Sequence, residues 1–378
     1  EFIVLAGHDK ETEDLEAYAS LNGKTFEQAH FPYNFHEGHD NDYTVLDSST
    51  HAVNLFVLNE EDKDRKFGTI VKSNSNGTSY VVSATQVNAN DEGYVDFEKV
   101  PGLEGVTLIN QVANPDKKQK TKTLQTRISH NDGSEWGYLP PPAKDIEGKS
   151  FKCSSKGDKS CALHLHHYTE RDDKRKTFAA STAVGLMFGV GNVGSELGDI
   201  SEADTFMTTD AGISWKMVKK GHWTWQYGDQ GSIIVLVQRA TRQNDVKTKM
   251  ISYSTDEGEN WTDIEFADSD VTVLDITTVS SGISRNFLLW CRSGKGKLFT
   301  VSLDFTGLAD EPCKLTDGKD SDYYLWSPKH PLQNDDCLFG HKSQYLRKKV
   351  DSVCYNEQSL QRLIQYTDCD CTRRDYEW

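Results

Sequence analysis

The sequence has no hydrophobic run long enough to cross a membrane. Its longest apolar stretches, such as Ile233–Val237, are far shorter than the ~20 residues that a spanning helix needs. The first residues, Glu1–Gly7, lack a basic region and a small-residue cleavage pattern, which argues against a signal peptide there. We therefore expect no membrane span in these 378 residues, and a chain that begins within a longer structure.

Basic charge is scarce as well. The 42 Lys and Arg residues face 58 Asp and Glu residues, which gives a net charge of −16. A surface field of that sign repels phosphate backbones and anionic lipid, so we expect no nucleic-acid partner.

Long amphipathic helical patterns are also absent. Short β-type runs bounded by Gly, Asn and Asp occupy most of the region before residue 308. Examples are Phe2–Ala6, Asn54–Leu58, Ser232–Gln238, Asn286–Trp290 and Leu298–Leu303. The pattern predicts an all-β fold.

Cysteine usage indicates a compartment and a domain boundary. Eight cysteines and two Asn-x-Thr sequons, at Asn76 and Asn260, are typical of an oxidising, glycosylating compartment. Five of the cysteines crowd the C-terminal end, after an isolated Cys291. This change in density predicts a boundary near Leu308, with a large unit over residues 1–308 and a small cysteine-rich unit over residues 309–378.

One octapeptide recurs in the large unit, of the form Ser/Thr-x-Asp-x-Gly-x-x-aromatic. Its best copies are Ser129–Trp136, which has Asn in place of Asp, Thr208–Trp215 and Ser254–Trp261. In a β-hairpin turn of this kind the Asp or Asn side chain accepts backbone N–H groups, glycine supplies a positive φ, and the aromatic ring packs beneath. The residues expected in these structural roles are Asn131, Gly133, Trp136, Asp210, Gly212, Trp215, Asp256, Gly258 and Trp261.

Two degenerate copies, Ala19–Phe26 and Ser73–Tyr80, precede them. The five starts are 54, 56, 79 and 46 residues apart, close to the length of a four-stranded propeller blade. The longest gap holds three prolines from Pro140 onward, and then Cys153 and Cys161. It predicts an inserted, solvent-facing loop clipped by a disulfide. The aspartates of the repeats are expected to form turns on the outside of the propeller and not to act as catalytic acids.

Together with these repeats, three stretches resemble the sortilin-type sorting receptors: CALHLHHY from Cys161, VGNVGSEL from Val190 and HWTWQYGDQGSIIV from His222. The tail, with CLFG from Cys337 and CDCTRRDY from Cys369, resembles the start of that family's cysteine-rich module. The resemblance covers essentially the whole chain. It implies the C-terminal half of a ten-bladed luminal β-propeller with Asp-box hairpins, followed by an incomplete module.

The resemblance also implies a disulfide framework, which pairs Cys153 with Cys161, Cys313 with Cys354, and Cys337 with Cys369. Cys291 and Cys371 are left without assigned partners. Trp378 stands where the family pattern has another cysteine, which leaves the pairing of Cys371 open. No ligand-binding residue can be carried over from the family by motif.

Two motifs have sharper alternative interpretations. Gly189–Gly194 satisfies the dinucleotide-binding fingerprint, but the hairpin repeat that soon follows leaves no room for the helix that would hold a pyrophosphate. His164 and His166 alternate along a strand and could ligate zinc with His167 or His222. Ordinary packing within a blade is the simpler explanation, and we expect neither a cofactor nor a metal site.

Asp-box hairpins also occur in sialidases, so a secreted propeller-fold glycoside hydrolase is an alternative, and an extracellular adhesion module is another. A sialidase-like enzyme needs an arginine cluster, and the spacing of Arg127, Arg239 and Arg242 does not indicate one. The segment His30–Tyr43 has three histidines and suits a pH-responsive surface, although a solvated loop explains it more simply.

No nucleophile elbow, phosphate loop or paired metal motif is visible, so no catalytic residue is predicted. The resemblance implies a receptor that binds vacuolar hydrolase precursors, such as carboxypeptidase, in the late Golgi and releases them in the endosome. Its membrane span and cytosolic tail would lie beyond Trp378. The 12 histidines and the acidic excess predict binding that weakens between about pH 7 and 5.

Overall fold

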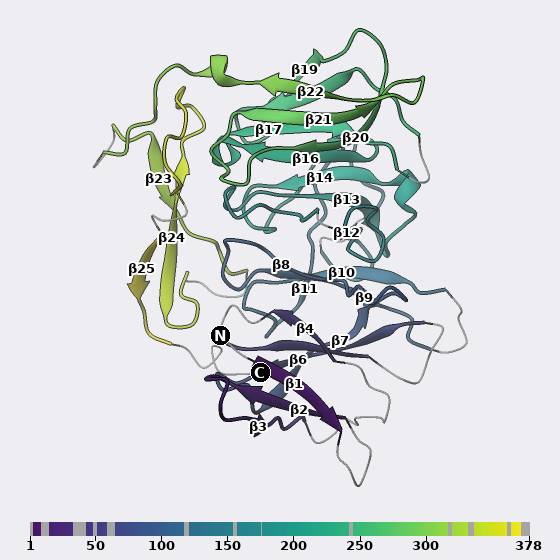
Figure 1. Cartoon of the computed structure of the whole chain (residues 1–378), viewed down its shortest axis with the longest axis vertical. Coiled ribbons are helices and arrows are strands. Elements are labelled where there is room, and N and C mark those ends of the chain that lie inside the picture. Colours follow the sequence, from purple (N-terminus) through teal and green to yellow (C-terminus); the bar gives the residue numbers. More distant parts are fainter. Residues whose placement is uncertain are drawn as a thin grey trace.

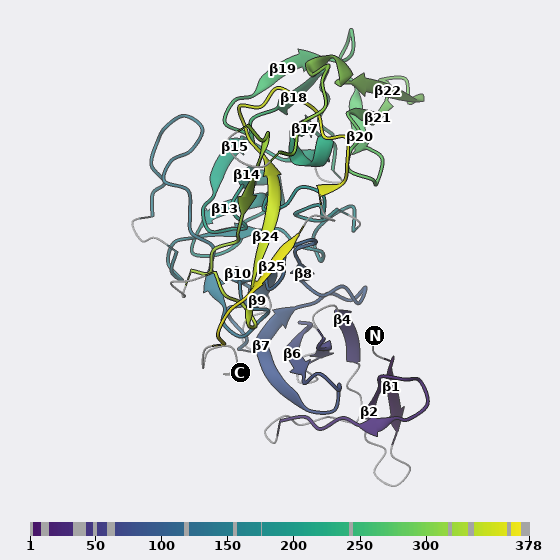
Figure 2. The ribbon, with the colours of Figure 1, turned by 90° about the vertical axis from the view of Figure 1, so that its left-hand side faces the viewer.

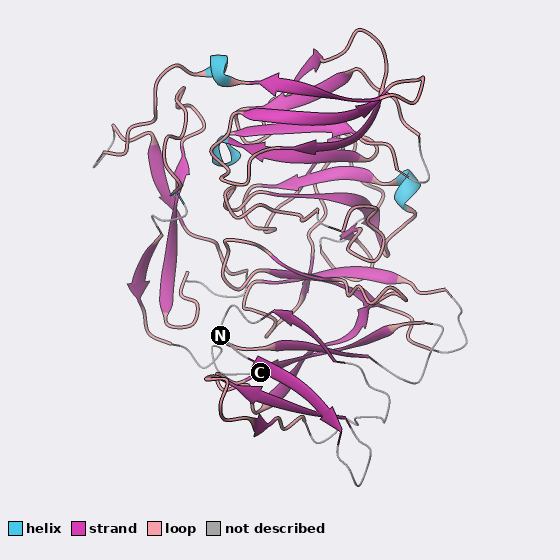
Figure 3. Ribbon diagram, in the orientation of Figure 1, coloured by secondary structure: helices cyan, strands magenta, loops and turns pink. Residues whose placement is uncertain are grey.

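The computed structural model of the chain is built almost entirely from antiparallel β-strands (Figure 1). It describes residues 3–8, 15–32, 43–47, 51–58, 65–116, 121–153, 157–174, 176–241, 245–316, 320–331, 336–360 and 364–371. Three short 3-10 helices lie between strands of these residues: η1 (Ile200–Glu202), η2 (Asp229–Gly231) and η3 (Thr306–Leu308) (Figure 3). No helix in these ranges is long and apolar enough to span a membrane.

The strands of the described residues follow one another closely along the chain. They are β1 (Ile3–His8), β2 (Leu15–Ser20), β3 (Glu27–Gln28), β4 (Tyr43–Asp47), β5 (Asn54–Leu58), β6 (Phe67–Ser73), β7 (Tyr80–Asn88), β8 (Phe97–Lys99), β9 (Thr107–Val112), β10 (Leu124–Ser129), β11 (Gly137–Tyr138), β12 (Ala162–Leu165), β13 (Met187–Gly194), β14 (Asp204–Thr208), β15 (Lys216–Lys219), β16 (Trp223–Gly228), β17 (Ile233–Gln238), β18 (Met250–Ser254), β19 (Thr262–Glu265), β20 (Thr272–Thr277), β21 (Asn286–Arg292), β22 (Leu298–Asp304), β23 (Tyr323–Trp326), β24 (His341–Lys348) and β25 (Gln365–Asp368).

Each sheet is made from consecutive strands. Within the described ranges the sheets are β1–β3, an eight-stranded sheet of β4–β11, two four-stranded sheets of β12–β15 and β16–β19, and three-stranded sheets of β20–β22 and β23–β25. In the eight-stranded sheet the order is β11-β10-β9-β7-β6-β5-β4, with β8 paired to β9. A chain that completes one antiparallel sheet before starting the next is organised as the blades of a propeller are, and the all-β propeller fold is confirmed.

Strand β17 shows why the sheets stack face to face. Its sequence IIVLVQ is apolar and rich in β-branched residues, which favour a strand, and the residues Ile233–Val237 are buried. Because side chains alternate between the two faces, Val235 and Val237 join the core shared with β20–β22, while Ile234 and Leu236 join the core shared with β12–β15. The sheet β16–β19 is therefore covered on both sides.

The 79-residue separation between the first and second full repeats includes two loops that flank β12. Their described residues are 139–153 and 157–161 in the first, and 166–174 and 176–186 in the second. A disulfide between Cys153 and Cys161 closes the end of the first loop. The second loop carries a dense set of charged side chains, which pack between sheets.

The sheet β23–β25, here called the C-terminal module, lies alongside the stack (Figure 1). Seen from its own side, β24 runs across the ends of several successive sheets (Figure 2). The burial of β24 alternates: Ser343, Tyr345 and Arg347 are buried and their neighbours are less so. One face of the strand therefore packs on the propeller sheets.

Candidate functional site

The three best copies of the octapeptide fold into the same turn. In the third copy, Ser254 Oγ accepts the Gly258 N–H at 2.8 Å, and Asp256 Oδ1 accepts the Asn260 N–H at 2.9 Å. The corresponding acceptors are Ser129 and Asn131 in the first copy, and Thr208 and Asp210 in the second. The side-chain oxygens of these aspartates are thus used to close turns, which is a structural role.

The glycine of each turn has a positive φ and lies against a tryptophan ring. Gly212 has φ +87°, and a Cβ placed there would meet Ile128 Cδ1 at 2.5 Å and Trp215 Cζ2 at 3.8 Å. Gly133 and Gly258 have φ +89° and +76° and lie in the same way beside Trp136 and Trp261. These positions exclude any residue with a side chain for two reasons, backbone conformation and space.

The residue before each glycine is left-handed too, which the sequence did not indicate. Asp132, Ala211 and Glu257 have φ of 57°, 61° and 56°, a region that residues with a Cβ rarely occupy. All three hold a neighbouring element, and the Ala211 carbonyl does so at 2.9 Å from His130 Nε2. Lys72 Nζ donates to the Asp132 carbonyl at 2.9 Å and also pairs with its carboxylate, while Glu257 pairs with Arg347.

The degenerate copies form turns of other kinds. At the first, Ser20 Oγ accepts the Gly23 N–H at 2.9 Å and Asn22 Oδ1 accepts the Thr25 N–H at 2.9 Å, which is the same arrangement one residue shorter. At the second, Asn74 Oδ1 accepts the Thr78 N–H at 3.0 Å. The decline in match quality toward the N-terminus therefore reflects different turn geometry.

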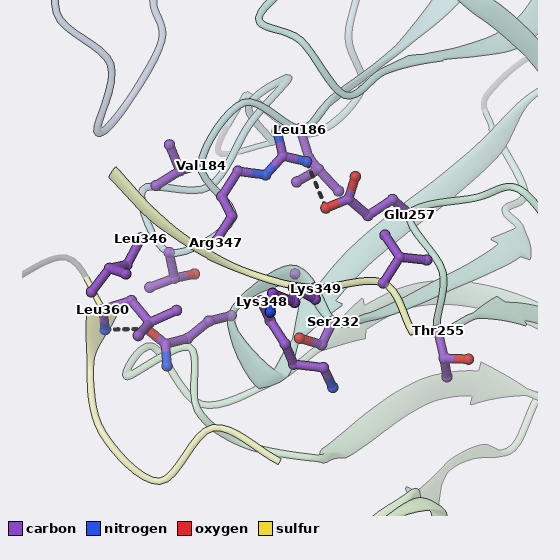
Figure 4. Close-up of a pocket in the computed structure, with 14 residues that line it drawn as sticks. Val184, Leu186, Ser232, Thr255, Glu257, Leu346, Arg347, Lys348, Lys349 and Leu360 are labelled. Atoms are coloured by element: carbon purple, nitrogen blue, oxygen red, sulfur yellow. Dashed lines mark hydrogen bonds and ion pairs between the residues drawn. The ribbon is translucent and has the colours of Figure 1, made fainter. Parts of the chain in front are cut away.

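Arg347 is the central contact between the module and the propeller sheets (Figure 4). Its Nη1 donates to the Thr209 carbonyl at 2.8 Å, and its Nη2 lies 2.6 Å from Glu257 Oε1. Its guanidinium group also lies 5.1 Å from the centre of the Trp326 ring, a cation–π distance. Because Thr209 and Glu257 belong to the second and third repeat turns, one module side chain bridges two sheets.

A second anchor lies at η2. Asp229, Gln230 and Gly231 have φ of 45°, 54° and 91°, so three successive residues are left-handed. Asp229 Oδ1 accepts the Asn356 N–H at 2.8 Å, and Gln230 Oε1 accepts the Leu360 N–H at 2.6 Å. Contacts from the module thus hold a turn that costs on the order of 1 kcal/mol for each non-glycine residue.

A third anchor joins the module to the loop after β8. His341 Nε2 lies 2.7 Å from Glu104 Oε2, and Ser343 Oγ donates to the same oxygen at 3.4 Å. The three anchors follow one face of β24 and the segment after it, and they contact β4–β11, β12–β15 and β16–β19. The sequence assigned none of these residues a contact role, although Asp229 and Gln230 lie in the family-like stretch from His222 and the alternation of β24 signals a one-sided strand.

Three disulfides lie in the described residues, between Cys153 and Cys161, Cys313 and Cys354, and Cys337 and Cys369. Cys291 is a buried thiol whose pKa burial raises to about 11, and Cys371 is an exposed thiol. The two module disulfides span 41 and 32 residues, so they restrain most of that small unit.

The histidines near β12 do not converge on a metal position. His164 Nδ1 accepts the Thr126 N–H at 3.0 Å and its Nε2 lies 3.2 Å from the Gly194 carbonyl, so both ring nitrogens are used. Burial lowers its pKa to about 4. His166 instead faces Glu170, with Nδ1 2.5 Å from Oε2. The glycine-rich stretch Gly189–Gly194 lies within β13, and a helix that could hold a pyrophosphate does not follow it in the described residues.

The second loop beside β12 joins distant sheets through buried ion pairs. Arg171 Nη1 donates to Glu98 Oε2 at 2.9 Å, on β8, and Lys176 Nζ lies 3.3 Å from Asp275 Oδ1, on β20. Burial raises the pKa of Glu98, and the charge of Arg171 acts in the opposite direction. Arg127 lies on β10 and Arg239 just after β17, and the two form no cluster. Arg242 falls outside the described residues, as does most of His30–Tyr43.

Comparison with known proteins identifies the family. A family model described as "Sortilin, neurotensin receptor 3" matches residues 1–276, and one described as "Sortilin, neurotensin receptor 3, C-terminal" matches residues 278–378. The chain belongs to the sortilin family. The glycoside hydrolase alternative is therefore not favoured.

Similar curated sortilin-family proteins come from fungi and are named vacuolar protein sorting/targeting protein 10. That of Colletotrichum graminicola is 67% identical over 100% of this chain and 25% of its own length. Those of Fusarium vanettenii and Verticillium alfalfae are 64% and 59% identical over 97% and 98% of the chain, and 24% and 27% of their own lengths. The chain thus spans about a quarter of these relatives.

Solved structures similar to this sortilin-family chain are distant. An alpha-L-arabinanase of Penicillium chrysogenum gives a TM-score of 0.30 at 10% identity, with 80% of this chain and 90% of that chain covered. A xyloglucanase of Xanthomonas campestris also gives 0.30, at 13% identity over 94% of this chain and 51% of that chain. Likeness at this level has no bearing on function.

Proposed function

We propose that the chain is part of the luminal cargo-binding region of a sorting receptor. The receptor carries vacuolar hydrolase precursors, such as carboxypeptidase, from the late Golgi to the endosome. The observation that carries the proposal is the match over the whole chain to fungal proteins named for vacuolar protein sorting, at 67% identity in one case. The role is binding without catalysis, which agrees with Asp210 and Asp256 being used in turns.

The proposal includes how the chain is placed in the cell. The region lies in the lumen of the Golgi and endosome and is attached by a membrane span outside this segment. Asn76 and Asn260 are both exposed and would carry N-linked glycans. Expression in a secretory host, with Asn76→Gln and Asn260→Gln as controls, should give an endoglycosidase-sensitive mass shift that each substitution reduces by one glycan.

We also propose a division near residue 308, in a ring of ten blades of which this chain supplies about half. The packing of Phe305 into the core of β16–β22 supports a boundary just after it. Limited proteolysis should then cut between residues 309 and 322 before it cuts within β20–β22. Earlier cleavage within β20–β22 would place the boundary elsewhere.

Binding of a vacuolar carboxypeptidase precursor to the complete luminal region, at pH 7 and pH 5, tests the proposed function. We expect saturable binding that weakens at the lower pH, and no turnover of fluorogenic glycosides. Absence of binding at both pH values would contradict the cargo assignment, and glycoside turnover would contradict the non-enzymatic role.

A further inference from the structure

A small pocket lies between the sheets β12–β15 and β16–β19, and the cargo proposal does not involve it. It encloses about 50 Å³. One water molecule needs about 10–15 Å³ by this measure, so the space accommodates a group of several heavy atoms. Ile200 of η1 lines it, and η1 lies on the side of the sheets away from the module (Figure 3). The pocket is therefore separate from the module contacts.

Arg171 supplies a buried donor to this pocket. Its side chain is 10% exposed, its Nη1 donates to Glu98, and its guanidinium lies 4.1 Å from the centre of the Phe178 ring. Its Nη2 is buried and has no hydrogen-bond partner among the described residues. A guanidinium group can only donate, and a buried charged donor without an acceptor is costly. The site therefore requires an acceptor.

His166 presents a second buried nitrogen, which donates when the ring is protonated. The Glu170 carboxylate only accepts, so Nδ1 carries a proton, and an Nε2–H then exists in the imidazolium form. The residue is 3% exposed, its Nδ1 is engaged by Glu170, and its Nε2 is buried with no partner among the described residues. His222 lines the same pocket from the start of β16. Burial, then the charges of His166 and Arg239, lower the pKa of His222 to about 4. Nearby positive charge therefore disfavours protonation of this ring.

The charged lining holds three cations and two anions, while Glu98 and Asp275 pair with two of the cations from outside the lining. Arg171, Lys176 and Arg239 line the pocket against Asp172 and Asp173. Arg239 Nη1 lies 4.0 Å from Asp173 Oδ2, which is too long for a hydrogen bond and leaves the guanidinium group only loosely engaged. Val190 and Trp225 close the apolar side. An oxyanion can accept from several of these donors, and such charge-assisted bonds are the strong ones.

We propose that this pocket is an oxyanion subsite that takes a carboxylate, with Arg171 and His166 as the contacting donors and Arg239 and His222 beside them. The carboxylate is either that of a small free anion or that of a peptide side chain. The proposal stands independently of which cargo the receptor carries.

The test uses the full chain with ¹⁵N-labelled histidine rings and three probes at constant ionic strength. Acetate represents the free anion, N-acetyl-aspartate amide represents a peptide carboxylate, and N-acetyl-asparagine amide is the neutral match. His166→Gln and His222→Gln assign the two ring signals. We expect acetate to shift both signals saturably, and the asparagine probe to leave them unchanged.

Variants then locate the effect. Arg171 is buried and paired, so Arg171→Gln can fail to fold, whereas Arg239→Gln removes a looser contact and should weaken acetate binding at least about tenfold. Arg292→Gln, at the distant end of β21, is the matched control and should change nothing. Binding of both carboxylates indicates a peptide source, and binding of acetate alone indicates a free anion. No saturable shift, an equal response to asparagine, or unchanged binding in Arg239→Gln would overturn the proposal.

Discussion

Arg347→Met should loosen the module from the propeller sheets while leaving its own fold intact. The Arg347 side chain is 6% exposed and that of Glu257 is 21% exposed, so the substitution leaves a largely buried carboxylate without its cation. Breaking a buried pair on one side costs about 3–5 kcal/mol, and the partial exposure of Glu257 places this case at the lower end. The lost bond to the Thr209 carbonyl adds about 1 kcal/mol.

The combined loss of about 4 kcal/mol corresponds to a roughly 1,000-fold lower equilibrium constant for docking. The Asn356 and Leu360 amides donate to Asp229 and Gln230 across the interface, so their hydrogen exchange measures this opening. The measurement also avoids the assumption that a chain with several sheets unfolds in one step. We expect protection of these two amides to fall by about that factor, while protection in β17 is unchanged.

A double-mutant cycle with Glu257→Gln isolates the pair. The double variant should lose less than the sum of the two single variants, because the second change removes a carboxylate that is already unpaired. Lys342→Met, on the same strand and with no ion pair among the described residues, is the matched control. Protection of the Asn356 and Leu360 amides in Arg347→Met that matches the control would refute the view that this side chain holds the module.

Three further outcomes follow from positions elsewhere in the chain. Gly212→Ala should lower the free energy of unfolding by about 3 kcal/mol in denaturant titrations, because it combines a left-handed backbone with overlap at Ile128. Gly148→Ala, at φ +77° in open space, should lower it by about 1 kcal/mol, and equal losses would contradict the packing argument. Replacing Cys313 and Cys354 by serine opens a loop of 41 residues and should lower the free energy of unfolding by about 4 kcal/mol. The same change at Cys153 and Cys161, which are 8 residues apart, should lower it by about 3 kcal/mol, and a larger loss there would contradict the chain-entropy estimate. His164 has a pKa of about 4 when folded, so the unfolded chain binds more protons between pH 6.5 and 4, and the free energy of unfolding falls by about 2 kcal/mol at pH 5. Unfolding titrations at pH 7 and 5 should show a smaller fall for His164→Asn. An unchanged fall would exclude His164 as a source of the pH dependence of stability.

The propeller sheets could be predicted from the sequence because their signals are local. Each full repeat closes its turn with bonds between residues four apart, such as Gly258 to Ser254 and Asn260 to Asp256, so the octapeptide itself contains the interaction. The sheets also join consecutive strands, and the spacing of turns therefore reports the spacing of sheets. The same locality explains the weaker copies, because Ser20 and Asn22 make a shorter turn that the octapeptide pattern does not describe.

The module contacts could not be predicted because they are not local. Arg347 and Thr209 are 138 residues apart, and His341 and Glu104 are 237 apart. Alternation along β24 indicates that one face is buried, but nothing in the pattern states which surface covers it. The left-handed residues at Asp132 and Glu257 are also hidden from the sequence, since residues with a side chain occupy that region uncommonly, Asp more often than Glu, and surrounding contacts decide where they do.

The buried histidines limit the mechanisms by which the proposed acid release of cargo can occur. Burial lowers the pKa of His130, His164 and His222 to about 4, and that of His167 further. While the chain is folded, these rings stay neutral between pH 7 and 5, so they do not change the charge of a binding surface in that interval. Their effect is on stability, because each favours the unfolded or opened state as pH falls. A response of the surface must therefore come from other groups, such as those of His30–Tyr43, and the two mechanisms are separable. A surface response changes affinity without changing hydrogen-exchange protection, whereas loosening by buried histidines lowers protection at pH 5 even without cargo.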